Sequence, residues 1–411
     1  MSASSSQAEK ILGRCRELAR VTDVPAETTR TFLSPAMRQA NGVVAAWMRS
    51  AGLQVGMDAA GNLRGMRAAA TVDAATFVLA SHLDTVPNAG AFDGVLGVVL
   101  ALAVVEQLAV EPLPFHIEVI AFSEEEGVRF GTPFIGSRAL AGTLDETLLA
   151  RVDGAGISVR EAIRGYGLDI AQLPLAMLRK PLGYLEFHIE QGPELDSEGL
   201  PLGVVESLAG QSRYIIIFTG QANHAGTTPM RLRHDAMAAA AEWIIEVERS
   251  ANATQTLVAT CGSVQTLPGA GNIIAGQVRV SLDVRSANDA TREDAVTHLL
   301  QAAQDCGAKR GVTVQTTLQM QQPAVPLDRT LLRLLEDAVD STGAPIRRMV
   351  SGAGHDAMIV APHMPAALLF LRTPDGQSHH PQEAVLPADV ALALDAGVAF
   401  IRALAAKETQ P

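Results

Sequence analysis

The first third of the chain alternates between two hydrophobic periodicities. Apolar residues recur at helical spacing over 37–52 and again over the glycine-rich segment 94–109, whereas 76–80 and 116–122 are short apolar runs of strand length. Helices and strands that alternate at this spacing predict crossover units and a mostly parallel sheet. Because ligands bind beyond the carboxyl ends of strands in such sheets, the residues after these strands are the first candidates for chemistry.

A different pattern begins near residue 213. It predicts strand, helix, strand, strand, helix and strand over 213–220, 233–249, 254–265, 276–284, 291–306 and 312–320. This order is typical of a ferredoxin-like α+β domain. A linker-like segment, QQPAVP, follows it, and helices are predicted again over 329–341 and 387–405. We therefore predict an α/β fold in which residues 1–212 and 328–411 form a mostly parallel-sheet domain and residues 213–327 form an inserted ferredoxin-like domain.

Composition and charge restrict the class of protein. The chain has 411 residues, which predicts two or three domains that each bury a core. Hydrophobic residues make up 48% and charged residues 18%, as in a well-packed globular protein. Lysine and arginine number 32 against 44 aspartates and glutamates, a net charge of −12 with no run of five like charges. Because phosphate binding needs clustered basic side chains, neither nucleic acid nor an anionic membrane is an expected partner.

The cysteines and the apolar segments indicate the compartment. Cys15, Cys261 and Cys306 are widely separated and lie in no metal-binding spacing, which is typical of unpaired thiols in a reducing environment. The longest apolar stretch, 95–105, is far shorter than the ~20 residues of a membrane-spanning helix. The N-terminal segment has no apolar core of signal-peptide length. We therefore predict a cytoplasmic protein without membrane contact.

Residues able to bind metal follow the first predicted strand of the parallel sheet. His82 and Asp84 come directly after it, and Asp93 lies at the start of the apolar helix. A histidine and an aspartate at adjacent strand ends can share a cation, and Asp84 is placed to accept the second ring N–H of His82. A hydrogen-bonded structural pair is the alternative that these residues alone allow.

Three consecutive carboxylates, Glu124, Glu125 and Glu126, end the second strand of this sheet. Adjacent carboxylates repel one another, which destabilises the turn unless a cation or a proton lies between them. A solvated acidic turn is the alternative, but the histidine and aspartates expected at the same sheet edge weigh against it. We expect this turn to bind metal.

Two further segments contribute histidines. Polar and apolar residues alternate in LEFHIEQG, which predicts a strand with Glu186, His188 and Glu190 on one face. Near the C-terminus, His379 and His380 lie in a turn between a glycine and a proline. Zinc, manganese, cobalt and nickel all accept mixed histidine and carboxylate ligands, whereas calcium and magnesium prefer oxygen, so the first four metals stay open.

Eight short sequence blocks occur in a characteristic order along the chain. They are HLDTV, FDG, EEEGVRF, FHIEQGP, GQANHAGTTPM, DVR, SGAGHDAM and SHHP. In this order and spacing they resemble the hydantoinase/carbamoylase family of amidohydrolases, a branch of the zinc aminoacylase and carboxypeptidase superfamily. The resemblance extends from about residue 10 to residue 405.

The resemblance implies a centre of two divalent metal ions in each subunit. The positions that match the family's ligands are His82, Asp93, Glu126, His188 and His379. Asp93 would bridge the two ions. His82 and His188 would complete the ligands of one ion. Glu126 and His379 would complete those of the other, with His379 and not the adjacent His380 in the ligand position. Two such ions activate water and polarise the carbonyl group under attack.

The resemblance also implies the groups that move protons. Glu125 falls on the general base, which takes a proton from water and returns it to the leaving nitrogen. His224, in the loop 221–229, matches a histidine that donates a hydrogen bond to the developing oxyanion and can reach the site of the neighbouring subunit. Without the resemblance, this loop would fit equally well as a cap on the helix that follows.

Substrate binding is implied for five more positions: Gln191, Asn272, Arg285, Gly354 and His355. Arg285 ends the strand-like segment VRVSLDVR, and its planar guanidinium suits two parallel hydrogen bonds to a carboxylate. Because the small domain dimerises in the family, a homodimer is the expected active form.

The reaction that the resemblance implies is hydrolysis of a linear ureido group on a small carboxylate-bearing substrate. Allantoate and N-carbamoyl-L-amino acids are the nearest substrates, with N-carbamoyl-β-alanine behind them. His188, where peptidase relatives generally carry an acid, favours this reaction over that of a metallopeptidase or an N-acyl-amino-acid deacylase. A non-catalytic binding protein is the third alternative, and the complete set of ligand types together with Glu125 disfavours it.

Overall fold

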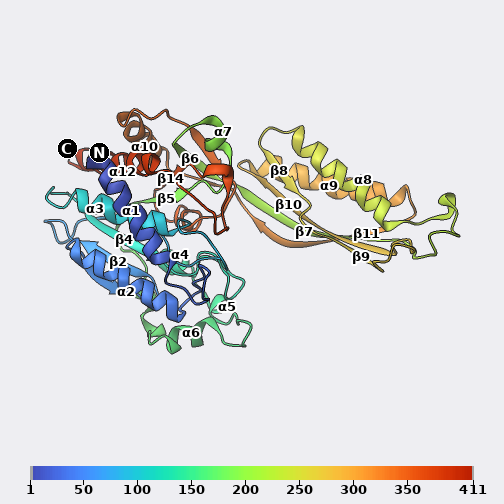
Figure 1. Ribbon diagram of the computed structural model, residues 1–411, viewed down its shortest axis with the longest axis horizontal. Helices are drawn as coiled ribbons and strands as arrows, with labels where there is room; N and C mark the ends of the chain where they lie inside the picture. The colour runs from blue at the N-terminus through green and yellow to red at the C-terminus, as the bar shows by residue number, and fades with distance from the viewer. Residues whose placement is uncertain (1–2, 410–411) are drawn as a thin grey trace. The chain divides into compact units, whose positions relative to one another are not determined.

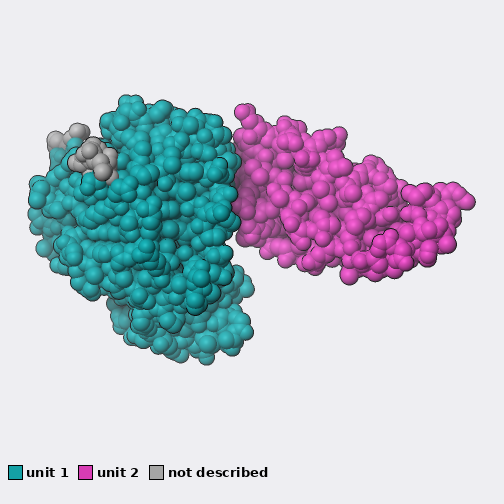
Figure 2. Space-filling view, viewed as in Figure 1, with its two compact units in different colours: residues 1–206, 327–411 teal, residues 207–326 magenta. Residues whose placement is uncertain are grey.

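The computed structural model describes residues 3–409, which form two compact units (Figure 2). Unit 1 takes the chain up to Glu206 and again from Leu327 onward, and unit 2 is the continuous segment Ser207–Pro326. Unit 2 is therefore inserted into the sequence of unit 1. Its first strand begins at Gly210, three residues before the alternating pattern starts.

The larger sheet has nine strands (Figure 1). They are β1 (Gln54–Met57), β2 (Leu63–Arg67), β3 (Thr76–His82), β4 (His116–Phe122), β5 (Pro181–Ile189), β6 (Leu202–Leu208), β12 (Val325–Pro326), β13 (Arg348–Ser351) and β14 (Ala366–Leu371). Their order is β1-β2-β4-β3-β5-β14-β6-β12, with β13 paired to β6. The central strands β4, β3, β5 and β14 are mutually parallel, and antiparallel strands flank them. The parallel centre confirms the predicted fold class and brings the carboxyl ends of these strands to one edge.

The helices of unit 1 surround this sheet. They are α1 (Ala3–Ala19), α2 (Pro35–Ser50), α3 (Val95–Gln107), α4 (Ile135–Ala141), α5 (Glu146–Leu149), α6 (Val159–Gly165), α7 (Glu194–Glu198), α10 (Arg329–Ser341), α11 (Asp356–Val360) and α12 (Pro387–Glu408), with 3-10 turns η1 (Ile170–Leu175) and η3 (Pro374–Gly376). Helix α3 is apolar around its whole circumference because it packs against β3 and β5 as well as against α1 and α12. Its burial holds the turn at its N-terminus firmly against the sheet.

Side-chain caps determine where the predicted helices begin. Ser34 accepts a hydrogen bond from the backbone N–H of Met37, and Pro35 occupies the first helical position, so α2 starts two residues before the periodic pattern. Asp328 accepts hydrogen bonds from the first backbone N–H groups of α10. That helix has the predicted bounds, 329–341.

Unit 2 has a five-stranded antiparallel sheet in the order β11-β7-β10-β8, with β9 also paired to β10. Its elements are β7 (Gly210–Thr219), η2 (Met230–Leu232), α8 (Ala236–Asn252), β8 (Leu257–Thr260), β9 (Val264–Leu267), β10 (Gln277–Ser286), α9 (Asp289–Ala308) and β11 (Thr313–Gln322). Both helices cover the same face of the sheet (Figure 1), where they bury alternate residues of β10. Trp243 of α8 is fully buried there and donates a hydrogen bond to the carbonyl oxygen of Leu299.

One predicted element of unit 2 is wrong. The single strand expected over 254–265 is broken into β8 and β9, because β8 ends with Thr260 opposite Asp283 and β9 begins with Val264 opposite Val280. The three residues between them therefore lie opposite only two residues of β10, which is the one-residue excess of a β-bulge. A hydrophobic pattern that continues through such a bulge does not reveal the break.

Residues 3–409 contain neither a membrane-spanning helix nor a disulfide bond. No helix in this range has the length and apolar character that crossing a bilayer requires. Cys15, Cys261 and Cys306 are free thiols.

Candidate metal centre

The residues predicted to bind metal meet at the carboxyl edge of three adjacent parallel strands. His82 is the last residue of β3, His188 lies near the end of β5, and Glu126 follows β4. Asp93 stands in the turn before α3, and His379 comes from the loop between β14 and α12. Segments that are nearly three hundred residues apart in the sequence thus contribute to one site.

The first group of ligand atoms joins His82, Asp93 and His188. The Nε2 atoms of the two histidines lie 3.3 Å apart. Asp93 Oδ1 is 3.2 Å from His188 Nε2 and 4.0 Å from His82 Nε2. All three side chains are buried. The three atoms therefore point at one small volume, as the ligands of a single cation do.

The hydrogen bonds of the two imidazoles determine which nitrogens are available. His82 Nδ1 lies 3.0 Å from the carbonyl oxygen of Asp84, and His188 Nδ1 lies 2.9 Å from that of Ile189. Because a carbonyl oxygen only accepts, each Nδ1 carries a proton, and each ring in its neutral form presents a lone pair at Nε2. Two lone pairs facing each other repel unless a proton or a cation lies between them. The geometry therefore fits a metal ion.

A second group joins Asp93, Glu126 and His379. Asp93 uses its other oxygen here, with Oδ2 at 3.0 Å from His379 Nε2. Glu126 Oε1 lies 3.6 Å from the same nitrogen and, among the described residues, receives no hydrogen bond. Burial of a carboxylate oxygen without a hydrogen-bond donor destabilises the folded state, and a cation shared with Asp93 would offset this loss of stability. Asp93 thus stands between two groups, one on each oxygen.

The pKa shifts within the site run in both directions. Burial opposes protonation of His82, but the carboxylates of Glu125, Asp84 and Asp93 outweigh it and raise its pKa well above the ordinary value. Burial raises the pKa of Glu126, and the nearby carboxylate of Asp93 adds to it, giving a value of about 7. Burial lowers the pKa of His188 to about 4, so its ring is neutral at physiological pH. The hydrogen bond to Asp93 raises the pKa of His379 to about 9. A buried carboxylate that resists ionisation and a buried neutral histidine both favour a positive charge between them.

Glu125 belongs to neither of the two groups that contain Asp93, but its carboxylate lies with the side chains of His82 and Glu126 in another group of possible ligand atoms. Its Oε2 is 3.9 Å from His82 Nε2, and its side chain is buried. Burial raises the pKa of Glu125 well above its ordinary value, despite the opposing effect of His82, and the carboxylates of Glu126 and Asp356 raise it further. A buried carboxyl group with a raised pKa is suited to general acid–base chemistry.

Asp84 positions the acidic turn. Its Oδ1 accepts the backbone N–H of Glu125 and its Oδ2 that of Glu126, each at 3.0 Å. The hydrogen bond from His82 goes to the main-chain oxygen of Asp84, while the carboxylate oxygen is 3.6 Å away. Asp84 thus accepts the second ring N–H of His82 through its main-chain oxygen, while its carboxylate accepts the two N–H groups of the turn.

A glycine makes the approach of α3 to this site possible. Gly94 has φ +65°, and a Cβ atom on it would lie 2.4 Å from the ring atoms of His82. The backbone next to Asp93 therefore packs directly on the imidazole, which only glycine allows in this conformation.

Comparison with known proteins agrees with this geometry. Residues 78–405 match the model of Peptidase family M20/M25/M40. The N-carbamoyl-L-amino acid amidohydrolase of Geobacillus stearothermophilus is 40% identical over 383 residues, which cover 92% of this chain and 93% of that protein. Allantoate deiminase 2 of Glycine max is 36% identical and covers 96% of this chain and 89% of its own. A solved amidase of the hydantoinase/carbamoylase family from Burkholderia multivorans superposes with a TM-score of 0.92 at 31% identity, over 97% of this chain and 98% of that one.

The chain belongs to the hydantoinase/carbamoylase family. This confirms the resemblance drawn from the eight sequence blocks, and with it the predicted class of enzyme, a hydrolase acting on C–N bonds. Enzymes of the wider M20 family are metal-dependent, in agreement with the two ligand groups.

Three predicted substrate-binding residues of this family member lie in unit 1 near the ligands. Gln191 Nε2 donates hydrogen bonds to both carboxylate oxygens of Asp93. The ring of His355 packs edge-on against His188, with centroids 4.4 Å apart. Gly354 passes close to Phe134, whose ring a Cβ atom at this position would approach to 2.9 Å.

The other predicted residues lie in two adjoining loops and a strand of unit 2. The backbone N–H of Ala225 donates to the carbonyl oxygen of Asn272, which joins the loop of His224 to that of Asn272. His224 is exposed, and its Nδ1 accepts the backbone N–H of Gly226, so its Nε2 carries the proton and can donate. Arg285, on β10, forms a paired hydrogen bond with Asp283.

A further buried cluster, Glu186, His188 and His355, also contains metal-binding residue types. Both nitrogens of His188 are already engaged in the contacts described above. Glu186 Oε2 accepts the hydroxyl of Tyr184 and the backbone N–H of Ala357, each at 2.9 Å. These hydrogen bonds engage only Oε2, whereas Oε1 of Glu186 is buried and receives no hydrogen bond among the described residues.

The sequence reasoning missed Glu383. Its Oε1 accepts the backbone N–H of Phe92 at 2.8 Å and that of Asp93 at 2.9 Å. Glu383 lies four residues after His379, so its buried carboxylate ties the loop of one ligand to the turn of another. The only signal in the sequence was an acidic residue close behind SHHP, and no local pattern shows which backbone it contacts.

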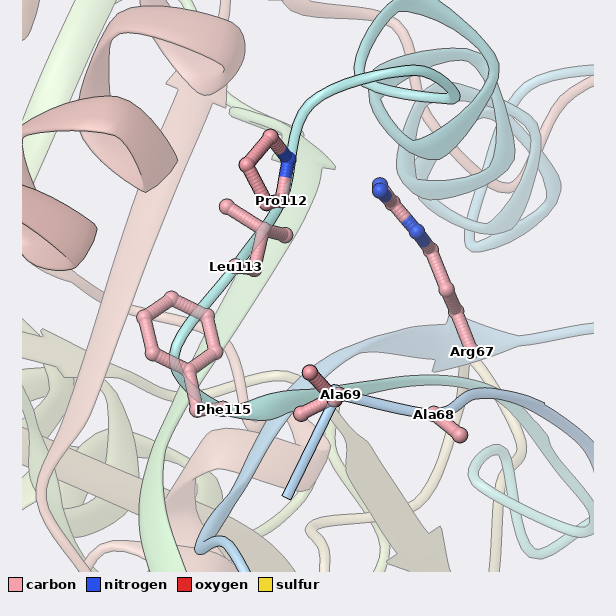
Figure 3. Close-up of a pocket in the computed structure, with 7 residues that line it drawn as sticks. Arg67, Ala68, Ala69, Pro112, Leu113 and Phe115 are labelled. Carbon is pink, nitrogen blue, oxygen red and sulfur yellow. The ribbon is translucent and has the colours of Figure 1, made fainter.

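Unit 1 also has a small pocket (Figure 3). It is lined by Arg67, Ala68, Ala69, Ala70, Pro112, Leu113 and Phe115. These segments follow β2 and precede β4, so the pocket lies at the amino end of β4, whereas the acidic turn follows its carboxyl end. Arg67 donates to the carbonyl oxygens of Leu108 and Glu111, a structural role at the end of α3.

Proposed function

We propose that the protein hydrolyses the C–N bond of a linear ureido group on a small carboxylate-bearing substrate such as allantoate or an N-carbamoyl-L-amino acid. The reaction converts R–NH–CO–NH2 and water into R–NH2, CO2 and NH3. The observation that carries the proposal is the buried carboxylate of Glu125 beside two ligand groups that share Asp93. The names of the relatives from Geobacillus stearothermophilus and Glycine max support the substrate class.

Two divalent cations, of zinc, manganese, cobalt or nickel, are part of this proposal. His82, Asp93 and His188 would hold one, and the group that shares Asp93 with Glu126 and His379 would hold the other. When bound, such cations supply Lewis acidity that polarises the scissile carbonyl and acidifies water. The donor set supports these metals because it mixes imidazole nitrogen with carboxylate oxygen.

Glu125 is the proposed general base and acid. Its carboxylate would take a proton from the attacking water and pass it to the leaving nitrogen. The raised pKa supports the second step, proton donation to the leaving nitrogen, because burial and neighbouring carboxylates favour the protonated form of Glu125. The paired hydrogen bonds of Asp84 would keep the turn, and so this carboxylate, in position.

The substrate contacts are proposed from both units. His224 would donate its Nε2–H to the oxyanion, which the hydrogen bond at its Nδ1 supports by setting the tautomer. We assign Arg285 to the substrate carboxylate and Asn272 to its other polar groups. Gln191, with Gly354 and His355 behind it, would line the pocket in unit 1.

A substrate panel tests the proposal. Metal-stripped protein is reconstituted in turn with zinc, manganese, cobalt and nickel, and ammonia release is measured on allantoate, N-carbamoyl-L-amino acids and N-carbamoyl-β-alanine. Free amine is scored on N-acetyl-amino acids and dipeptides. We expect ammonia from a ureido acid. Activity on acyl or peptide substrates alone would indicate a deacylase or metallopeptidase, and inactivity with every metal would indicate a binding protein.

The active form that we propose is a homodimer in the cytoplasm. Unit 2 exposes Ile245 on α8 and Val258 on the edge strand β8, at 65% and 62%, and an unpaired apolar edge of this kind suits pairing with a second copy. Light scattering should give twice the chain mass of 43.2 kDa. Ile245→Glu should give monomers, whereas Val110→Glu, at a valine of unit 1 that is 93% exposed, should not. The three free cysteines support the proposed cytoplasmic location, because thiols stay unpaired in a reducing compartment.

A further inference from the structure

Gln191 is held at an unusual position between β5 and α7. Its backbone has φ +59°, and its N–H donates to Thr373 Oγ1 at 3.1 Å, where Thr373 is fully buried. The main chain is therefore anchored, and only the side-chain torsions of Gln191 are free to change.

The side chain of Gln191 reaches into the second ligand group. Nε2 lies 3.2 Å from Asp93 Oδ1 and 3.1 Å from Oδ2, and it is 3.2 Å from His379 Nε2. The amide nitrogen, and not the oxygen, must face Asp93, because a carboxylate can only accept. The amide nitrogen thus lies against Oδ2 and His379 Nε2, two of the atoms that a cation on Asp93, Glu126 and His379 would bind, and also against Oδ1.

We propose that the amide of Gln191 and the second cation compete for Asp93, so that binding of this cation turns the Gln191 side chain away from Asp93. This inference rests on the proposed two-cation function. The N–H groups carry partial positive charge and therefore repel the cation. A lone pair of Asp93 that accepts an N–H cannot at the same time bind the cation. The anchored backbone restricts the released amide to a swing about its own torsions, within reach of a substrate at the same centre.

The consequence is that Gln191 weakens one of the two cation-binding steps. A hydrogen bond to a charged group is strong, and the amide nitrogen lies within 3.2 Å of both Asp93 Oδ2 and His379 Nε2, so a cation that binds these two atoms must displace it. Removing the amide should therefore tighten that step by roughly tenfold. A ligand role through the amide oxygen would have the opposite effect.

The test is calorimetric titration of metal-stripped protein with Zn²⁺ and, separately, with Mn²⁺. Gln191→Leu keeps much of the side-chain volume but has no donor, and Gln191→Ala checks that the effect does not depend on bulk. Gln377→Leu makes the same chemical change at an exposed glutamine in the His379 loop. Thermal unfolding confirms that each variant is folded.

Both Gln191 variants should bind two cations with the weaker step tightened by roughly tenfold, while Gln377→Leu matches the parent protein. Unchanged affinity would overturn the inference, and weakened affinity would overturn it by making Gln191 a ligand. A parent protein that binds no cation would instead refute the proposed function itself, so the two failures are distinguishable.

Discussion

At the scale of single residues, Asp93 determines the character of the site. One of its oxygens faces His188 and the other faces His379, so a single buried carboxylate joins both ligand groups. Three histidines outweigh the effect of burial and hold its pKa well below the ordinary value. Asp93 therefore stays ionised, and the groups that position it decide how well cations bind.

Substitution of Glu383 tests that positioning. Glu383→Ala removes the acceptor for the backbone N–H of Phe92 and Asp93, and cation affinity should fall roughly tenfold or more, as for other partners of metal ligands. Glu383→Gln keeps Oε1 as an acceptor for both N–H groups and should restore affinity. Calorimetric titration measures both. Equal losses in the two variants would show that the charge of Glu383, and not its hydrogen bonds, matters.

The buried carboxyl groups predict a pH dependence of stability. Burial raises the pKa of Glu126 to about 7 and that of Glu124 to about 8. Between the unfolded value near 4.5 and these values the folded state holds more protons, so the free energy of unfolding of metal-stripped protein should fall as pH rises from about 5 to 8. Cations would lower the folded pKa of Glu126, and denaturant titrations with zinc should show a smaller slope. Equal slopes would place the cations elsewhere.

At the scale of elements, the site depends on how strand ends and helix starts approach each other. The apolar runs predicted β3 and β4, and the order of helices and strands predicted the parallel edge where the ligands meet. The break between β8 and β9 escaped prediction because a bulge depends on the partner strand. The contacts of Glu383 and of the Asp84 carboxylate escaped it because both acceptors bind backbone N–H groups, which carry no sequence identity.

The approach of α3 to β3 can be tested at its glycine. Gly94→Ala places a Cβ atom against the ring of His82, and the residue must also keep φ +65°. We expect lower thermal stability together with loss of cation binding. Gly131→Ala is the matched control, because Gly131 has φ +61° but no atom within 4 Å of the added Cβ. This control should lose some stability and keep its cations. If both variants lost cation binding, backbone strain and not the contact with His82 would be the cause.

At the scale of the whole molecule, the proposed residues come from two units, and the exposed His224 belongs to the inserted one. An oxyanion donor on a domain that dimerises can serve the site of the partner subunit. The order of the units along the chain and the types of their residues were predictable from the sequence. Which subunit a side chain serves depends on assembly, which no local pattern encodes.

Mixed dimers test this arrangement. Glu125→Gln and His224→Ala subunits are each inactive alone, but after subunit exchange each mixed dimer has one site with both groups intact if His224 acts on the partner. Because half of the dimers are mixed, the sample should recover about one quarter of the parent activity. Activity that stays at the level of the separate variants would show that His224 serves its own subunit.

The most direct test of the central claim is turnover and metal content of Glu125→Gln measured on the same sample. The amide keeps the shape of the side chain but cannot accept the proton, so hydrolysis of the ureido substrate should fall by at least a hundredfold while two cations per subunit remain bound. Near-parental turnover with both cations present would contradict the account, because the proton would then be taken by another group.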